Sequence, residues 1–306
     1  MPSLRRTQAA YGHSVWPRSR AILAVTVAMS LLSTDTGFAA WPWSREPAKV
    51  PPKRITVPKR VTAPKRAAAP KRVTAPKPAS LKCEPSKLRV ILDVGHTAQS
   101  QGALSARNIP EFDFNVQIAR RIGDKLKSEG FVETSLLVTE GKAKRSLFKR
   151  VAAANQSKTD LLLSIHHDSV PDSLLEQWEF DGKKSHFSDR FSGYSLFVSP
   201  RNPRFEASLT FARLLGHQMK AQGLQYATQY TLPIMGRHRR KLLDKEVGVY
   251  RYDELVVLGR TQMPAILLEA GSIINRDEEL AMSSPARQDM ISAAVAGAVK
   301  EFCRSR

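Results

Sequence analysis

Acidic residues and cysteines are scarce in this sequence, and it has no apolar run of the length that a membrane-spanning helix needs. Among 306 residues there are 28 Asp and Glu against 48 Lys and Arg, and only two cysteines. The apolar stretch Ala21–Ser33 has thirteen residues, whereas a helix that spans the bilayer core needs about twenty. No other segment approaches that length, so we expect no transmembrane helix.

The positive charge is unevenly distributed along the chain. The formal net charge is +20, of which residues 1–40 carry +3 and residues 41–80 carry +10, leaving about +7 for residues 81–306. The excess therefore belongs to two N-terminal segments and not to the part that has a globular composition. This distribution argues against nucleic-acid binding.

Residues 1–39 resemble a secretory signal peptide. A basic segment with four arginines precedes Ala21–Ser33, and Gly37-Phe38-Ala39 offers small residues for cleavage after Ala39. An uncleaved anchor or a buried helix is the alternative interpretation. We expect a cleaved signal and a protein that is exported to the periplasm and soluble there.

Residues 40–80 form a low-complexity linker. The tripeptide Pro-Lys-Arg begins at Pro52, Pro58, Pro64 and Pro70, a period of six residues. Six residues are two turns of a polyproline II helix, so the basic pairs would lie along one side. We expect a disordered tether whose cationic side contacts anionic wall polymer or membrane; an inert spacer is the alternative.

Residues 81–306 alternate between strand-like and helix-like patterns. Helical spacing of apolar residues occurs in Phe112–Leu126, Ser146–Asn155, Phe205–Gly223 and Ser284–Phe302. Short apolar runs typical of strands are Leu88–Leu92, Glu133–Thr139, Leu161–Ile165, Tyr194–Val198 and Ala265–Glu269. This alternation predicts an α/β domain with a mostly parallel, twisted sheet flanked by helices on both faces.

The two cysteines, Cys83 and Cys303, lie at opposite ends of the predicted domain. An oxidising compartment permits a disulfide between them, which would stabilise the fold by closing a very long loop. Two free buried thiols are the alternative.

Chemically useful side chains follow three of the predicted buried strands. His96 comes after the first strand, His166 directly follows Leu161–Ile165, and Glu269 ends the last strand, while Glu111 lies at the start of the first helix. Two imidazoles and a carboxylate are a common ligand set for catalytic zinc, and a further carboxylate beside the bound water supplies a base. Spacing alone leaves the individual roles unassigned.

Four segments between about residues 88 and 302 resemble the zinc-dependent N-acetylmuramoyl-L-alanine amidases of the amidase-3 family. The family's opening Asp-Pro-Gly-His loop is matched by Asp93–His96, and its Glu followed by Asn is matched by Glu111 and Asn115. The later motifs of the family are matched, in order, by Arg150, Ala154-Asn155, Asp160, Ser164–His166, and then by Pro264, Leu267, Glu269, Gly271, Asn275 and Asp277-Glu278.

The resemblance implies a peptidoglycan hydrolase that cuts the amide between the lactyl group of N-acetylmuramic acid and L-alanine. It also implies that His96, Glu111 and His166 bind one Zn²⁺ ion and that Glu269 is the catalytic carboxylate. We expect a monomer whose partners are peptidoglycan and an activator protein. Rival interpretations are a zinc enzyme that cuts within the stem peptide, and a non-catalytic wall-binding protein.

Some positions depart from the family pattern. His166-His167-Asp168 stands where His-Ala-Asn is common, so a one-residue shift would make His167 the ligand. Neighbouring side chains of a strand point to opposite faces, so only one of these histidines reaches the metal, and we favour His166. His167, Asn115 and Arg150 are then expected to support the metal ligands or to contact the substrate.

Two further segments could shape access to the site. Val170–Gly193 is interpreted as a loop whose aromatic residues either line the substrate groove or simply pack. In this family, the segment between the later strands can carry a helix that covers the zinc site. The corresponding region of this sequence is about Gln225–Tyr252. A short helix at His238–Glu246 with Glu246 is the candidate for such self-inhibition here.

Overall fold

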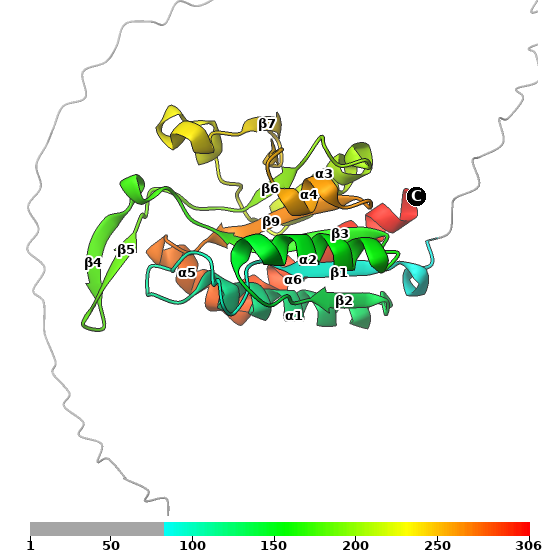
Figure 1. The fold of residues 1–306 in the computed structure, drawn as a ribbon, viewed down its shortest axis with the longest axis horizontal. Helices are drawn as coiled ribbons and strands as arrows, with labels where there is room; N and C mark the ends of the chain where they lie inside the picture. Colours follow the sequence, from blue (N-terminus) through cyan, green and yellow to red (C-terminus); the bar gives the residue numbers. More distant parts are fainter. Residues whose placement is uncertain (1–82) are drawn as a thin grey trace, which may run out of the picture. The chain divides into compact units, whose positions relative to one another are not determined.

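The computed structural model describes residues 83–306, in which a seven-stranded sheet is enclosed between helices (Figure 1). The order of strands in the sheet is β2-β1-β3-β9-β6-β8-β7. The α/β architecture with a mostly parallel sheet and helices on both faces is thereby confirmed. The predicted signal peptide and the whole predicted linker, residues 1–80, lie outside the described residues.

The sheet consists of a parallel block extended by a second set of strands. The bounds of its members are β1 Val90–Val94, β2 Thr134–Leu137, β3 Leu161–Asp168, β6 Ser195–Val198, β7 Lys241–Asp244, β8 Val249–Arg251 and β9 Ala265–Ser272. Strands β2, β1, β3 and β9 run parallel, whereas β6 is antiparallel to β9 and parallel to β8, and β7 is antiparallel to β8. In this register Glu269 lies beside His166.

Helices cover the two faces of the sheet with separate apolar clusters. Helices α1 Glu111–Ser128, α3 Phe205–Ala221 and α6 Pro285–Arg304 pack on one face, and α2 Ala143–Gln156 and α4 Val256–Arg260 pack on the other. Leu163 points to the first cluster and its neighbour Leu162 to the second, and both are fully buried. Burial on both faces explains why the central strands are continuous apolar runs without alternation.

Local sequence explains where α1 begins and ends. Glu111 follows Pro110, which lies at the N-cap, and the buried residues include Phe114, Ile118, Ile122 and Leu126 at helical spacing. Gly130 has a φ of 94° and allows the chain to turn back, so that the amide of Phe131 donates to the carbonyl of Leu126. The carboxylate of Glu111 is thus fixed at the first turn of a well-anchored helix.

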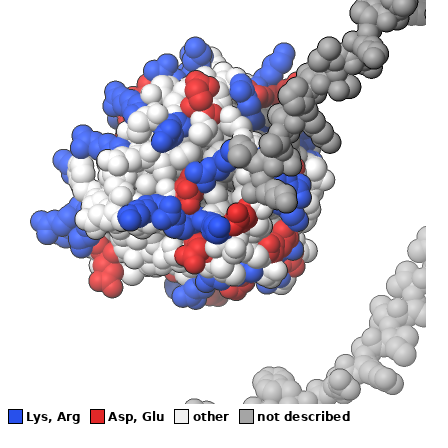
Figure 2. Space-filling view, turned by 90° about the vertical axis from the view of Figure 1, so that its right-hand side faces the viewer, with Lys and Arg blue, Asp and Glu red and all other residues white. Residues whose placement is uncertain are grey.

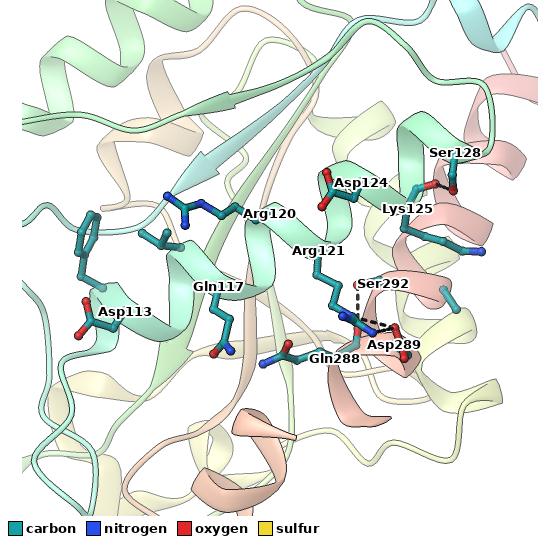
Figure 3. Close-up of a pocket in the computed structure, with 13 residues that line it drawn as sticks. Asp113, Gln117, Arg120, Arg121, Asp124, Lys125, Ser128, Gln288, Asp289 and Ser292 are labelled. Atoms are coloured by element: carbon teal, nitrogen blue, oxygen red, sulfur yellow. Dashed lines mark hydrogen bonds and ion pairs between the residues drawn. The ribbon is translucent and has the colours of Figure 1, made fainter. Parts of the chain in front are cut away.

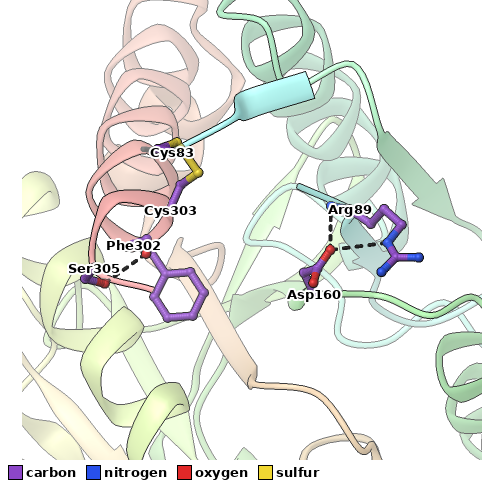
Figure 4. Close-up of a disulfide and its surroundings, with 6 residues drawn as sticks. All are labelled: Cys83, Arg89, Asp160, Phe302, Cys303 and Ser305. Atoms are coloured by element: carbon purple, nitrogen blue, oxygen red, sulfur yellow. Dashed lines mark hydrogen bonds and ion pairs between the residues drawn. A yellow bond between two sulfur atoms is a disulfide. The ribbon is translucent and has the colours of Figure 1, made fainter. Parts of the chain in front are cut away.

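A disulfide joins Cys83 to Cys303 near the end of α6 (Figure 4). The two Cα atoms are 5.2 Å apart, and the cysteines are separated by 220 positions in the sequence. The expected disulfide is therefore confirmed. Nearby, the side chain of Arg89 donates to Asp160 at 3.2 Å and connects the beginnings of β1 and β3.

Val170–Gly193, expected to be a loop, contains a β-hairpin. Strands β4 Glu176–Phe180 and β5 Lys183–Phe187 pair antiparallel and form an arm at the left of Figure 1. Asp181 and Gly182 connect them with positive φ angles of 51° and 69°. An Asp-Gly pair is a strong hairpin signal, because both residues tolerate this conformation.

The helix expected at His238–Glu246 is wrong. Lys241–Asp244 form the edge strand β7, and the amide of Glu246 donates to the side chain of Asp244 within the turn to β8. Gly248 ends this turn with a φ of 69°, which favours a hairpin over a continuing helix. The helix proposed to support self-inhibition is therefore not formed at His238–Glu246, and the short 3-10 helices of this region, Gln229–Thr231 and Pro233–His238, come before β7.

The surface at the amino-terminal ends of the parallel strands has mixed charge (Figure 2). Lys and Arg side chains are interspersed there with Asp and Glu, and Arg89 and Arg306 both contact Asp160.

In residues 83–306 there is no helix with the length and hydropathy needed to cross a bilayer.

Candidate metal centre and active site

The three predicted ligands meet at the carboxyl ends of the central strands. His96 follows β1, His166 lies in β3, and Glu111 is the first residue of α1. One potential ligand atom from each of the three lies within 4.8 Å of the other two. Side chains from three separate parts of the sequence therefore form a group of the size that one metal ion requires.

The carboxylate of Glu111 lies between the two imidazoles. His96 Nε2 is 2.9 Å from Glu111 Oε2, and His166 Nδ1 is 3.0 Å from Glu111 Oε1. Burial would raise the pKa of Glu111, but hydrogen bonds from His166 and His96 outweigh it, and this pKa lies far below its usual range. Glu111 is therefore ionised and offers a full negative charge.

A backbone amide and a side-chain amide also hold the Glu111 carboxylate. The amide of Ala103 donates to Oε2 at 3.2 Å, and the Asn115 amide group donates to Oε1 at 3.2 Å. Two glycines allow this close packing. A Cβ on Gly95 would lie 2.6 Å from the His166 ring, and one on Gly102 would lie 2.4 Å from Glu111 Oε2.

Glu269 lies next to this group on β9. It pairs with His166 in the register, and the pairing shifts just beyond, between His166 and Asp168, as in a β-bulge. Its Oε2 is buried and has no hydrogen-bond partner among the described residues. Burial, together with the charges of Asp168 and Glu111, raises the pKa of Glu269 well above its usual range.

His167 lies outside the group formed by His96, Glu111 and His166. Its side chain is buried against Phe114, with 5.4 Å between ring centroids, and Nδ1 is 2.8 Å from Asn115 Oδ1. Burial lowers the pKa of His167 to about 4, so the ring is neutral near pH 7. The geometry thus favours His166 as the ligand and gives His167 the task of orienting Asn115.

Arg150 and Asp168 are buried charged residues close to the ligands. Arg150 donates to Asp93 and to backbone carbonyls of the His96 loop, and it also lines the cavity that opens beside His96 and His166. Asp168 accepts hydrogen bonds from Tyr230 at 2.6 Å and from Gln229 at 3.2 Å. No sequence motif pointed to Tyr230, because it lies 62 positions from its partner in the sequence.

A cavity of about 220 Å³ opens beside the two histidines. Its walls include His96, His166 and apolar residues of α4, such as Leu255 and Leu258. A larger groove of about 920 Å³ runs between α1 and α6, where Figure 3 shows Arg121 paired with Asp289. That groove contains no histidine and none of the predicted site residues, so we assign the chemistry to the smaller cavity.

The residues present suit a zinc ion. Two imidazole nitrogens and one carboxylate oxygen are the donor types of catalytic zinc sites with three protein ligands. Glu111, Asp168 and Glu269 also place three acidic groups in a buried region, which a divalent cation would stabilise. Among the described residues, this is the one group of His, Cys, Asp and Glu that could hold a metal.

Comparison with known proteins identifies the fold and family. The family model for N-acetylmuramoyl-L-alanine amidases, amidase-3, matches residues 90–301. The chain belongs to this family. The expectation of an amidase that acts on peptidoglycan is thereby confirmed, and neither rival interpretation is favoured.

Relatives of this amidase are distant in sequence. The N-acetylmuramoyl-L-alanine amidase AmiC of Escherichia coli is 22% identical over 238 residues, which cover 70% of this chain and 52% of AmiC. An N-acetylmuramoyl-L-alanine amidase structure from Clostridium difficile 630 has 23% identity and a TM-score of 0.52, covering 72% of this chain and 98% of that one. Ami1 of Mycobacterium smegmatis has 20% identity and a TM-score of 0.54, covering 72% and 98%. These structures support the fold of the amidase domain.

Proposed function

We propose that residues 81–306 form a zinc-dependent amidase domain that releases stem peptides from peptidoglycan. In this proposal His96, Glu111 and His166 hold the ion, and Glu269 is the catalytic base. The bond cut is the amide between the lactyl carbonyl of N-acetylmuramic acid and the amino group of L-alanine. The observation that carries the proposal is the convergence of the three ligand side chains beside Glu269, whose Oε2 has no hydrogen-bond partner within residues 83–306.

Each residue has a defined part in this hydrolysis. A zinc ion held at the site would polarise the scissile carbonyl and lower the pKa of water next to it. Glu269 Oε2 accepts a proton from the attacking water as its oxygen bonds to the carbonyl carbon. The same carboxyl group then donates that proton to the nitrogen of L-alanine as the carbon–nitrogen bond breaks.

The surrounding residues keep the ligands in place during the reaction. Asn115 and the amide of Ala103 hold the Glu111 carboxylate, and His167 holds Asn115. Interactions of this kind orient metal ligands, and their loss typically lowers metal affinity roughly 10–100-fold. The cavity between α2 and α4 gives the substrate access to His96 and His166 from one side.

Mass spectrometry of wall digests tests the proposal. The mature protein should release intact stem peptides that begin with L-alanine, and a chelator should abolish this release. Glu269→Gln keeps the size of the side chain but removes the base, so we expect kcat to fall about 10²–10⁴-fold with zinc content unchanged. Glu206→Gln, in the first turn of α3 and exposed, is the matched control and should retain full activity. Fragments cut within the stem peptide, or full activity of Glu269→Gln, would contradict the proposal.

Location and partners follow from the substrate and from the N-terminal sequence. The signal-like residues 1–39 support export to the periplasm, and the basic repeats of residues 40–80 support contact with anionic wall polymer or membrane. An activator protein is part of the proposal as well. The CwlD amidase of Clostridioides difficile, which shares this fold with a TM-score of 0.52, has been solved in complex with the GerS lipoprotein.

A further inference from the structure

A buried arginine holds the backbone on both sides of Gly95. Arg150 extends from α2, and its side chain is only 2% exposed. One Nη atom donates to Asp93 Oδ1 at 3.1 Å and to the carbonyl of Val94 at 2.5 Å, and the other donates to the carbonyl of His96. Three acceptors within four consecutive residues thus converge on a single guanidinium group.

His96 adopts a backbone conformation that a histidine rarely adopts. Its φ is 65°, in the left-handed region where glycine is usually found. Such a conformation persists when the surroundings impose it, and it is concentrated at functional sites. The hydrogen bond from Arg150 to the carbonyl of His96 acts on the residue that has this conformation.

The arginine is electrically balanced without the substrate. Asp93 is completely buried, lies 3.1 Å from Arg150 and also accepts a hydrogen bond from Ser164 at 2.7 Å. The ion pair with Asp93 neutralises the buried charge of Arg150. Neutralisation requires no contact beyond the one with Asp93. The additional bonds to the Val94 and His96 carbonyls are what a residue that orients this loop requires.

We propose that Arg150 is a positioning residue, which presets His96 for metal binding by holding the Val94–His96 backbone. Arg150 acts through His96 and does not contact the substrate. The proposal rests on the metal site of the proposed function, and it adds a cause for the placement of one ligand. A guanidinium is needed because its planar, forked donors reach several acceptors at once, whereas a lysine ammonium is a point charge.

Arg150→Lys in the mature protein separates positioning from simple structural support. The lysine keeps the charge opposite Asp93 but loses the fork, so the metal-free protein should still fold, with an unfolding temperature lowered by the lost buried hydrogen bonds. We expect its apparent dissociation constant for Zn²⁺, from competition with a chromophoric chelator, to rise at least about 10-fold. Arg89→Met, which removes an ion pair at the opposite end of β1, is the matched control and should leave zinc affinity unchanged.

A second readout does not depend on metal. The ¹³C chemical shifts of His96 Cα and Cβ in the metal-free protein report its backbone conformation, and Arg150→Lys should move them away from values of the left-handed region. Wild-type zinc affinity together with unchanged shifts in Arg150→Lys would overturn the proposal. A raised KM with unchanged zinc affinity would also overturn it, because that pattern indicates a substrate contact.

The two proposals can fail separately. If His96→Ala binds zinc as tightly as the wild type, the proposed metal site is wrong, and the His96 chemical shifts alone then decide whether Arg150 sets this loop. If His96→Ala loses zinc but Arg150→Lys keeps wild-type affinity and shifts, the metal site stands and the positioning role falls.

Discussion

Removing the disulfide between Cys83 and Cys303 should cost this domain a large part of its stability. The bridge closes a loop of 220 residues, nearly the entire described chain. In the chain-entropy model, closing a loop of that length stabilises the folded state by about 5 kcal/mol. A domain of this kind has an unfolding free energy of roughly 5–15 kcal/mol, so the loss should be readily measurable.

Guanidinium unfolding of the double variant Cys83→Ser/Cys303→Ser, with a chelator present to remove metal binding, gives the magnitude. We expect the unfolding free energy to fall by about 3–5 kcal/mol, since the unfolded chain gains the freedom that the bridge removes. The reduced and alkylated wild type should behave like the double variant. A loss below about 1 kcal/mol would refute the reasoning and would mean that the bridge only fastens the short segment before β1.

Three other predictions concern separate features. Partial burial opposes ionisation of Asp160, but hydrogen bonds from Arg89 and Arg306 outweigh it and lower its pKa. Ionised Asp160 therefore stabilises the folded state. This stabilisation is present above the unfolded-state pKa of about 3.9 and is lost as pH falls through the lower folded-state pKa. The difference in unfolding free energy between the wild type and Asp160→Asn should thus shrink below about pH 4, and a constant difference down to pH 2 would contradict this assignment. Gly102→Ala puts a methyl group 2.4 Å from Glu111 Oε2 at a residue whose φ is 83°. Zinc affinity, measured by chelator competition, should therefore fall. An unchanged affinity would show that this loop adjusts freely. Tyr230→Phe leaves buried Asp168 without its shortest hydrogen bond; we expect a loss of about 1–3 kcal/mol in urea unfolding, and an equally stable variant would argue against this contact.

Much of the fold could be predicted because its central elements have strong local patterns. The spacing of Phe114, Ile118, Ile122 and Leu126 predicted α1, and the apolar run from Leu161 predicted β3. Elements at the periphery of the sheet were harder to predict from the sequence. The short strand β7 has only four residues, and its pairing with β8 decides its conformation more than its own sequence does.

The candidate site was predictable in part. Strand ends indicated His96, His166 and Glu269, and the family resemblance indicated their roles. The sequence favoured His166 over His167 as the ligand, and the side of β3 that α1 covers, where His167 packs against Phe114, supports this choice. Tyr230 was missed because its contact with Asp168 arises from the packing of a distant segment. The Asp181-Gly182 pair is a hairpin signal that distinguishes this segment from an irregular loop.

The most direct test of the account is anomalous X-ray diffraction at the zinc absorption edge from crystals of the zinc-loaded protein. We predict a single ion bound by His96, Glu111 and His166, with Glu269 beside its open position. An ion bound by His167, or zinc found only away from these three side chains, would contradict the central claim.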